Sequence, residues 1–389
     1  MSVIIYLSID HIHTFKRRKA MYAETKPCKV LYKPCDEKYS PDIRRFQGCP
    51  TIAVTKKGRI FLGWYSGGTG EPRIENYNIL SYSDDNGKTF KNLLIIPSDE
   101  ENMIHALDIQ LYVSGDGALH VVWVQNNAIR AGVGAKENWC TDHPMGIQEG
   151  VIFFDLKHSS WEVVCQDPDA DDIIFDEPKY VFDGFMRCKP LTLSNGNIIT
   201  FAYDQLTANH GYNISYDGGK TWERRYGGRK LKTFFDENMA YEKKDGDVVM
   251  YSRCELGCLA KEVSLDGGLT FSDDTESEIE APATRFFISR TPSGRVILVH
   301  NDDKKIRKNM SIWLSDDDGE SWPHRVCIDE RSAISYPDVD FYDGKIYMTY
   351  DRERTGAKEI FFSVFTEDDI INGRPIDVKI VSKPGLTSI

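Results

Sequence analysis

Short apolar stretches alternate with polar turns along most of the chain, a pattern typical of a protein built from β-strands. Examples of such stretches are Ile60-Phe-Leu-Gly-Trp-Tyr65, Val248-Val-Met-Tyr251 and Val296-Ile-Leu-Val299. None of the apolar runs approaches the roughly 20 residues that a membrane-spanning helix needs. The pattern therefore predicts an all-β protein without a membrane partner.

One turn motif, Ser-x-Asp-x-Gly-x-Thr-aromatic, recurs along the chain. Its four copies are Ser83–Phe90, Ser215–Trp222, Ser264–Phe271 and Ser315–Trp322, the last with Ser in place of Thr. The Asp can accept hydrogen bonds from the backbone of a tight turn, and the Gly can adopt the positive φ that such a turn requires. Each copy predicts a hairpin corner between two strands.

The spacing of the copies indicates how many repeats there are. Ser215, Ser264 and Ser315 are 49 and 51 residues apart, the length of one four-stranded propeller blade. The 132 residues from Ser83 to Ser215 leave room for two blades, so one blade has lost the motif. We expect its remnant at Ser160-Trp161, with strands at Val151–Phe154 and Trp161–Val164.

These repeats predict an all-β fold, a six-bladed β-propeller. The propeller is expected to span residues 28–370, between an N-terminal extension at residues 1–27 and a C-terminal tail at residues 371–389. A strand at Cys28–Lys33 is expected to complete the last blade, because a terminal strand often closes such a ring and removes an exposed edge.

Composition limits the partners. The 389 residues carry a formal charge of −12, which argues against a nucleic-acid or anionic-membrane partner. An acidic substrate would therefore need a local basic cluster in an acidic protein.

Nine cysteines, an odd number, indicate reduced thiols, and Cys254 and Cys258 form the only close pair. This pair is poor support for a metal site, so we expect no cofactor. The apolar start Met1–Ile9 lacks the features of a signal peptide, which predicts a cytoplasmic protein.

A ring of six blades with several such corners resembles the sialidase (neuraminidase) superfamily and its Asp-box relatives, over roughly residues 28–370. In that family the corner is structural and lies on the blade periphery, so the resemblance places the functional residues at the centre of the ring. It implies a tyrosine nucleophile activated by a glutamate, three arginines that bind the substrate's carboxylate, and an aspartate as general acid and base. A tyrosine suits a 2-keto acid sugar, because the sugar's carboxylate would repel an anionic nucleophile.

Three segments resemble the family's functional segments and follow one another in the family's order. In Asp236–Arg253, Glu237 corresponds to the activating glutamate and Arg253 to a carboxylate-binding arginine. Arg307, before the strand leading to the last corner, corresponds to a second such arginine. Tyr336, in Ser335–Asp351, corresponds to the nucleophile.

Blade one departs from the family pattern. Gly48 stands where the family has the first carboxylate-binding arginine, so Gln47, Arg73 and Arg285 are candidates for its task. The loop Ser66–Tyr77 stands where the family has its aspartate, and it offers Glu71 or Glu75 as the acid.

Two charged residues begin predicted inner strands and could face the central channel. Asp108 and Lys189 could bind substrate there or form an internal ion pair.

Three functions remain open. The first is a retaining exo-glycosidase that releases a terminal acidic sugar, a 2-keto acid or uronic acid-type sugar, from a carbohydrate partner. The second is a lyase that eliminates uronides with a base such as His105 or His210. The third is a non-catalytic carbohydrate-binding propeller, favoured by the absence of an arginine at Gly48.

Overall fold

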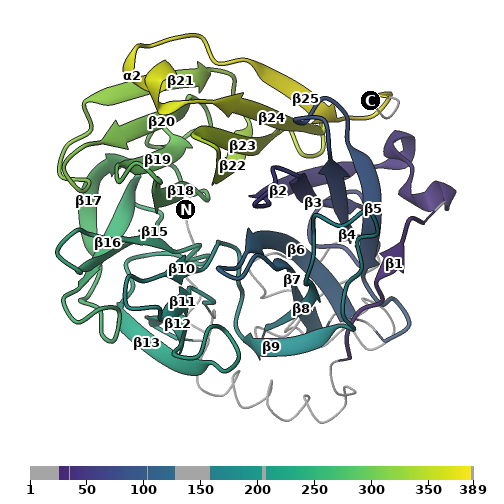
Figure 1. Cartoon of the computed structure of the whole chain (residues 1–389), viewed down its shortest axis with the longest axis horizontal. Helices are drawn as coiled ribbons and strands as arrows, with labels where there is room; N and C mark the ends of the chain where they lie inside the picture. Colours follow the sequence, from purple (N-terminus) through teal and green to yellow (C-terminus); the bar gives the residue numbers. More distant parts are fainter. Residues whose placement is uncertain (1–25, 35, 103, 128–157, 204–206, 387–389) are drawn as a thin grey trace, which may run out of the picture.

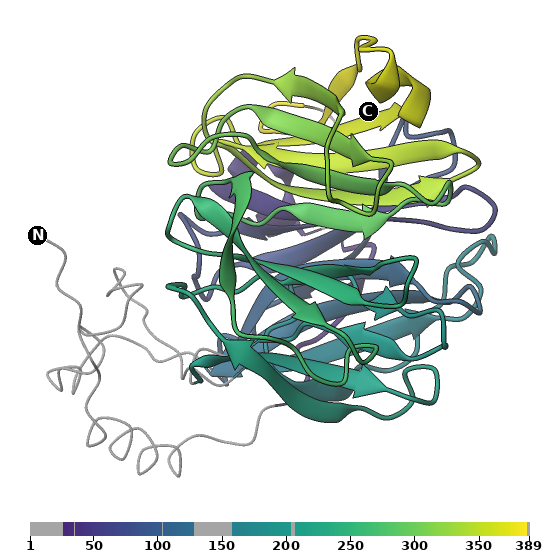
Figure 2. The same ribbon diagram turned by 90° about the vertical axis from the view of Figure 1, so that its left-hand side faces the viewer.

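Six antiparallel sheets surround a central axis in the computed structural model, which describes residues 26–34, 36–102, 104–127, 158–203 and 207–386 (Figure 1). The predicted all-β, six-bladed propeller is therefore confirmed. The blades pack side by side around the axis, as the edge-on view also shows (Figure 2). Each blade consists of consecutive strands that follow one another outward from the axis, except that the short N-terminal strand lies at the outer edge of blade one.

The strands of the first three blades follow the chain in order. Blade one comprises β1 (Leu31–Tyr32), β2 (Phe46–Val54), β3 (Ile60–Gly67), β4 (Tyr77–Ser83) and β5 (Lys91–Pro97). Blade two comprises β6 (Ile104–Val113), β7 (Leu119–Asn127), β8 (Ser159–Cys165) and β9 (Lys179–Asp183). Blade three comprises β10 (Leu191–Thr192), β11 (Ile198–Thr200), β12 (Asn209–Ser215) and β13 (Glu223–Arg229).

The other three blades have four strands each. Blade four comprises β14 (Met239–Glu242), β15 (Val248–Arg253), β16 (Cys258–Ser264) and β17 (Thr275–Glu280). Blade five comprises β18 (Phe287–Arg290), β19 (Val296–Asn301), β20 (Met310–Ser315) and β21 (His324–Asp329). Blade six comprises β22 (Ile334–Tyr342), β23 (Lys345–Arg352), β24 (Glu359–Phe365) and β25 (Val378–Ser382). The described helices are short: two 3₁₀ helices at Glu37–Tyr39 and Pro41–Ile43, and α2 (Glu367–Ile371).

The four turn motifs form corners between the last two strands of blades one, three, four and five. In the first corner, the Thr89 hydroxyl and backbone N–H donate to Asp85 at 2.7 and 2.9 Å, and the Gly87 N–H donates to the Ser83 hydroxyl at 2.9 Å. Gly87 has a φ of 74°, the conformation that the motif reserves for glycine. The other three corners repeat these contacts, so the turn prediction is confirmed.

Blade two differs from its prediction. Ser160-Trp161 lies inside β8 rather than at a corner, and β8 is the third strand of the blade. The fourth strand is β9, and the acidic segment 166–178 connects the two. The predicted strand Val151–Phe154 lies outside the described residues. The prediction failed because the connection has none of the turn motif that marks the other corners.

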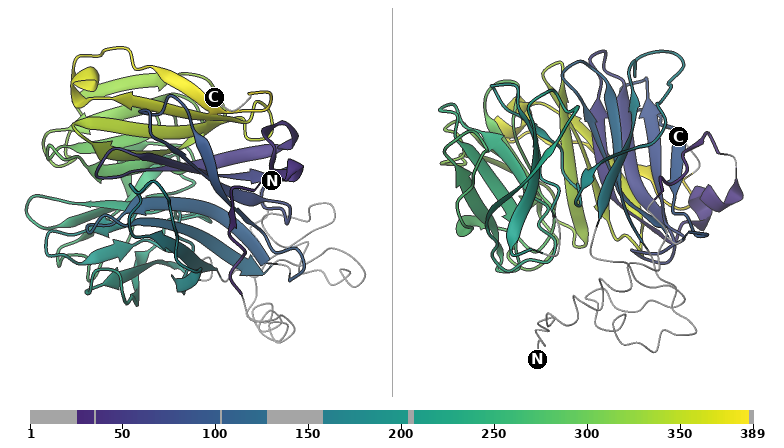
Figure 3. Two further views of the ribbon diagram at one scale, coloured as in Figure 1. Left: turned by 45° about the vertical axis from the view of Figure 1, so that its right-hand side comes forward. Right: turned by 90° about the horizontal axis from the view of Figure 1, so that it is seen from below.

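The ends of the chain also differ from the prediction. The N-terminal strand β1 pairs with β5 at the outer edge of blade one, and β25, from the predicted tail, completes blade six. No described strand is shared between the first and last blades. Side chains join them instead: Ser382 accepts a hydrogen bond from Arg44 at 3.2 Å, and the C-terminal strand lies beside blade one (Figure 3).

Carboxylates on the innermost strand of blade six also bind the backbone of β2. Asp338 accepts the Ile52 N–H at 2.9 Å and Asp340 accepts the Val54 N–H at 2.9 Å. We call this junction of blades one and six the seam. It places the start of β2 next to the start of β22.

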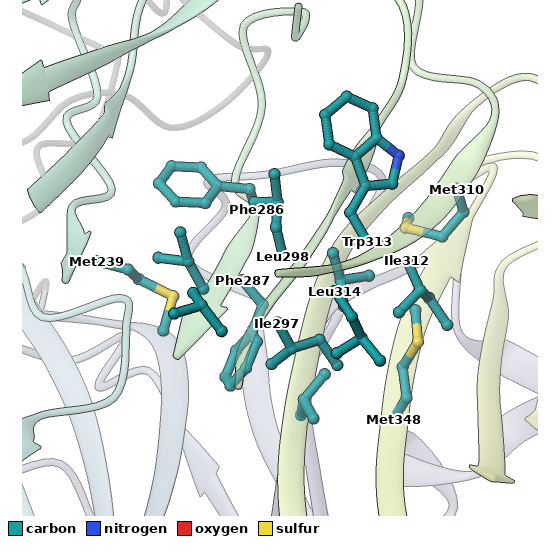
Figure 4. Close-up of a cluster of buried hydrophobic side chains, with 14 of the residues drawn as sticks. Met239, Phe286, Phe287, Ile297, Leu298, Met310, Ile312, Trp313, Leu314 and Met348 are labelled. Carbon is teal, nitrogen blue, oxygen red and sulfur yellow. The ribbon is translucent and has the colours of Figure 1, made fainter. Parts of the chain in front are cut away.

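The largest apolar cluster fills the space between blades four, five and six (Figure 4). Leu298 on β19 and Leu314 on β20 are fully buried there, against Phe287 on β18 and Met348 on β23. Alternating side chains of each strand thus pack one blade against the next. Among the described residues, no helix combines the length and apolar character that crossing a membrane would take.

Candidate active site

A cavity of about 210 Å³ opens where several blades meet near the ring axis. Four arginines, Arg187, Arg253, Arg307 and Arg354, line it together with two acids, Glu71 and Asp108. The ionised lining therefore carries 4 − 2 = 2 positive charges, although the chain as a whole carries a charge of −12. The basic cluster that an acidic substrate would need is present.

Tyr336 and Glu237 meet at the wall of this cavity. The Tyr336 hydroxyl donates a short hydrogen bond to Glu237 Oε1, and the two residues are 3% and 0% exposed. Tyr336 lines the cavity and Glu237 lies behind it. A hydroxyl that faces a cavity and is backed by a carboxylate is the arrangement of a nucleophile and its base.

The backbone holds both residues in an unusual conformation. Tyr336 has a φ of 58° and Glu237 a φ of 45°, in the left-handed region that costs side-chain-bearing residues roughly 1–3 kcal/mol. At Tyr336 the register of β22 against β23 shifts between Ser335 and Asp338, so a bulge turns the tyrosine ring toward the axis. Such strain collects at functional sites, where the surrounding structure holds it in place.

Two arginines bind the Glu237 carboxylate. Arg253 Nη1 lies 3.0 Å from Oε2 and Arg187 Nη1 lies 2.8 Å from Oε1. Burial disfavours the ionised form of Glu237, but the charges of Arg253 and Arg187 outweigh it and lower its pKa to about 2. Burial raises the pKa of Tyr336, while the nearby arginines oppose the rise. Tyr336 is therefore a neutral phenol that is hydrogen-bonded to an ionised Glu237.

Besides Arg187, whose guanidinium carbon lies 5.2 Å from the centre of the Tyr336 ring, three guanidinium groups of the cavity lie beside Tyr336. Arg253 donates to the Tyr336 hydroxyl at 3.3 Å, and the guanidinium carbons of Arg354 and Arg307 lie 4.1 and 5.7 Å from the centre of the ring. Arg307 also donates to the Ala283 carbonyl at 3.0 Å. A carboxylate in the cavity would lie within reach of these guanidinium groups, which can bind it bidentately.

Arg354 occupies the space beside Gly48. A Cβ added to Gly48 would lie 2.7 Å from Cγ and Cδ of Arg354, closer than such atoms approach. The Arg354 side chain thus crosses the position from which an arginine at residue 48 would extend. Asp351, Ser335 and Glu71 hold it there, with Asp351 Oδ2 at 3.0 Å from Nε and Ser335 Oγ at 3.3 Å from Nη2.

The two acids of the cavity are both paired with arginine. Glu71 accepts from Arg354 and lies 3.6 Å from the Cys49 thiol, and Asp108 binds Arg187. Burial opposes the ionisation of Glu71, but Arg354 and Arg187 lower its pKa. For Asp108, burial outweighs Arg187 and raises the pKa. Asp108 Oδ1 has no hydrogen-bond partner among the described residues, so it remains available to a ligand.

Three other predicted residues serve the framework instead of lining the cavity. Arg285 donates to the carbonyls of Arg187, Pro50 and Tyr336 at 2.9, 2.7 and 3.3 Å, so it fixes the backbone under the site. Gln47 accepts from Trp64 at 3.1 Å and from Ser382 at 3.2 Å in the seam. Lys189 donates to the Ile52 carbonyl and lies 3.5 Å from Asp338.

Four further candidates also lie outside the cavity lining. Arg73 is in the loop before β4, and Glu75 in the same loop is exposed. His105 and His210 are buried elsewhere, and burial lowers the pKa of His105 to about 4. The structure therefore brings together Tyr336, Glu237, Arg253, Arg307, Glu71 and Asp108 from the predicted set.

Sequence reasoning missed Arg354 and Arg187. Arg354 follows the buried Asp351 by three residues, but Arg352 is even closer to that acid in the sequence, so the segment alone does not single out Arg354. Arg187 precedes β10 much as Arg285 precedes β18, and no feature of its neighbourhood in the sequence marks it. Contacts between blades place both arginines in the cavity. The local sequence does not reveal these contacts.

Comparisons with known proteins agree with the fold. A family model described as a BNR repeat-like domain matches residues 161–348. Among curated protein sequences there is no match to this chain.

Similar solved structures include two sialidase-type enzymes. The intramolecular trans-sialidase from Ruminococcus gnavus, in complex with oseltamivir carboxylate, has 14% identity and a TM-score of 0.66, with 88% of this chain and 98% of that chain covered. The NanB sialidase from Streptococcus pneumoniae has 15% identity and a TM-score of 0.64, covering 91% and 73%. A protein of unknown function from Dyadobacter fermentans has 19% identity and a TM-score of 0.63, covering 87% and 98%. Residues 161–348 of the chain are thus similar to a BNR repeat-like domain, and its six-bladed fold is similar to that of the solved sialidase structures.

Proposed function

We propose that this protein is a glycoside hydrolase that releases a terminal sugar bearing a carboxylate, with Tyr336 as the nucleophile. The observation that carries the proposal is the hydrogen bond from the Tyr336 hydroxyl to Glu237 in a cavity lined by arginines. The similarity to structures of sialidases supports a glycosidase of this general kind. The carboxylate ligand in one of those structures supports an acidic substrate.

Each group has a step in this mechanism. Arg253, Arg307 and Arg354 bind the substrate's carboxylate and hold the anomeric carbon over Tyr336. Glu237 takes the phenolic proton as the Tyr336 oxygen attacks, because a neutral phenol with a raised pKa is a weak nucleophile. Glu71 donates a proton to the leaving oxygen and then activates the water that releases the sugar.

Glu71 must be protonated before it can act as the acid. In the free protein Arg354 holds it ionised. A substrate carboxylate would share the charge of Arg354 and so raise the pKa of Glu71. Substrate binding would thus prepare the acid as well as position the bond to be cleaved.

The other two functions have less support in the structure. The proposed lyase bases His105 and His210 do not line the cavity. Binding without catalysis was suggested by Gly48, but Arg354 supplies a guanidinium beside that glycine.

The test is hydrolysis of fluorogenic aryl glycosides that carry a carboxylate, with 2-keto acid sugars and uronides in one panel. Tyr336→Phe should lower kcat at least 100-fold on the substrate that is cleaved, with binding retained. Tyr251→Phe is the matched control, because Tyr251 is also buried but lies away from the cavity on β15. No turnover of any acidic glycoside by the unaltered protein, or full activity of Tyr336→Phe, would contradict the proposal.

A further inference from the structure

A second cluster of ionisable side chains is buried between blades three and four, outside the cavity. It contains His210 on β12, Glu262 on β16 and Asp274 just before β17, with one nitrogen or oxygen of each within 4.8 Å of the others. The side chains of the three residues are at most 1% exposed. Their burial alone makes an unneutralised cluster costly, so the groups need a shared partner.

Glu262 shows where that partner is missing. Its side chain is 0% exposed, and neither carboxylate oxygen has a hydrogen-bond partner among the described residues. Its Oε1 faces His210 Nε2 at 3.8 Å, too far for a hydrogen bond. Asp274 Oδ1 is likewise unpartnered in the described part of the chain. Buried carboxylate oxygens are normally satisfied, so these point to a group that the described residues do not supply.

The geometry points to a divalent metal ion bound by His210 Nε2, Glu262 and Asp274, and we propose this site as new. Bonds of about 2.0–2.2 Å place neighbouring ligand atoms about 2.8–3.6 Å apart at angles near 90–110°. His210 Nε2 lies 2.9 Å from Asp274 Oδ2 and 3.8 Å from Glu262 Oε1. Ser252 Oγ, 3.3 Å from the same nitrogen, is placed to complete the set.

The surrounding contacts suit a metal-binding histidine. His210 Nδ1 lies 3.1 Å from Asp236 Oδ2, so this carboxylate can accept the ring N–H in the tautomer whose unprotonated Nε2 faces Asp274 and Glu262. Lys230 pairs with Asp236 at 2.7 Å. With neutral histidine, three carboxylates and one lysine leave a charge of 1 − 3 = −2, which a dication cancels. Histidine with carboxylates is a ligand set for zinc or manganese.

The other group of three possible ligands, in the cavity, does not suit a cation. Cys49, Glu71 and Asp108 lie close together there, but Arg354 and Arg187 bind the two carboxylates. The proposed ion would instead stabilise the segment that holds Glu237, because Asp236 precedes that residue and accepts the Arg253 N–H at 2.8 Å through its backbone carbonyl. The proposal does not depend on the glycosidase assignment.

Elemental analysis of tag-free protein, produced with Zn²⁺ and Mn²⁺ in the medium, tests the site directly. We expect about one metal ion per chain, and at least a tenfold lower content in Glu262→Gln. The matched control is Glu276→Gln, an exposed glutamate on the neighbouring strand β17, which should retain the metal. A metal-free protein whose melting temperature does not respond to Zn²⁺ or Mn²⁺ would show that the cluster holds only protons, and would overturn the proposal.

Cobalt substitution keeps the test decisive if Glu262→Gln fails to fold. After chelation, Co²⁺ added to the unaltered protein should give weak visible bands without an intense near-ultraviolet thiolate band. A thiolate band would place the ion on cysteine, for example on Cys254 and Cys258, whose sulfur atoms are 3.9 Å apart, and would refute the assignment.

Discussion

Moving an arginine from position 354 to position 48 tests whether Arg354 binds the substrate. The single change Arg354→Ala removes a guanidinium that lies 4.1 Å from the centre of the Tyr336 ring. A hydrogen bond to a charged group contributes about 1.5–3 kcal/mol, which corresponds to about a 10- to 150-fold loss of kcat/KM. Gly48→Arg alone should also lose activity, because its Cβ would lie 2.7 Å from Arg354 carbons.

The double variant Gly48→Arg/Arg354→Ala should recover at least tenfold over Arg354→Ala. The new arginine would enter space that the truncated side chain has vacated, and Gly48 is not in the left-handed region that disfavours a side chain. It would also restore a cation beside the buried Asp351, whose ion pair in the described part of the chain is with Arg354. The effects of the two single changes would then not add, as expected if the two arginine side chains occupy the same space.

The assay is hydrolysis of the best acidic aryl glycoside, with melting temperatures measured for every variant. Arg352→Ala is the matched control, because Arg352 pairs with Glu353 and Glu359 and does not line the cavity. If Arg354→Ala stays within about twofold of the unaltered protein, Arg354 does not bind the carboxylate. If the double variant is no better than Arg354→Ala, position 48 cannot take over its role and the spatial replacement is refuted.

Three further predictions concern protonation and stability. Binding of a carboxylate inhibitor should take up protons, because sharing Arg354 with the ligand raises the low pKa of Glu71. Calorimetry in buffers of different ionisation enthalpy should show this proton uptake. Proton uptake that persists in Glu71→Gln would contradict the account. The pKa of Glu237 is depressed from 4.5 to about 2, so it contributes about 3 kcal/mol of stability that is present above pH 4.5 and lost as the pH falls toward 2. Acid titration of Glu237→Gln should therefore show a shallower loss of stability over that range, and an unchanged slope would argue against the depressed pKa. Leu298→Ala should cost about 2–5 kcal/mol in chemical denaturation because Leu298 is 0% exposed, whereas Leu265→Ala, at 79% exposure, should stay within about 0.5 kcal/mol; similar losses in both would contradict the packing described for blade five.

The blade repeat was predictable because its signal is local. An Asp and a Gly two residues apart, such as Asp217 and Gly219, specify the corner through contacts inside one turn. Blade two has no such motif, so its outer strands were misplaced. The edge that β1 joins was also wrong, since two sheet edges compete for a short strand and only tertiary packing chooses between them.

The residues of the candidate site also fall into those that the sequence could identify and those that it could not. Tyr336, Glu237, Arg253 and Arg307 were identified because their segments resemble those of a known family and follow its order. The role of Arg354 was not accessible, because Arg352 and Arg354 are equivalent in the local sequence. Only the packing of blade six against Gly48 of blade one separates them.

The seam makes completion of the candidate site depend on contact between the first and last blades. Tyr336 and Arg354 come from the last blade, whereas Gly48 and Glu71 come from the first, so the proposed nucleophile and the proposed acid meet only when the ends of the ring dock. A ribosome has made almost the whole chain before that docking can occur. Truncated chains would consequently be inactive rather than partly active, and the appearance of activity would report ring closure during refolding. A bound carboxylate would contact blades four, five and six through Arg253, Arg307 and Arg354. Substrate binding would therefore also stabilise the packing of these three blades.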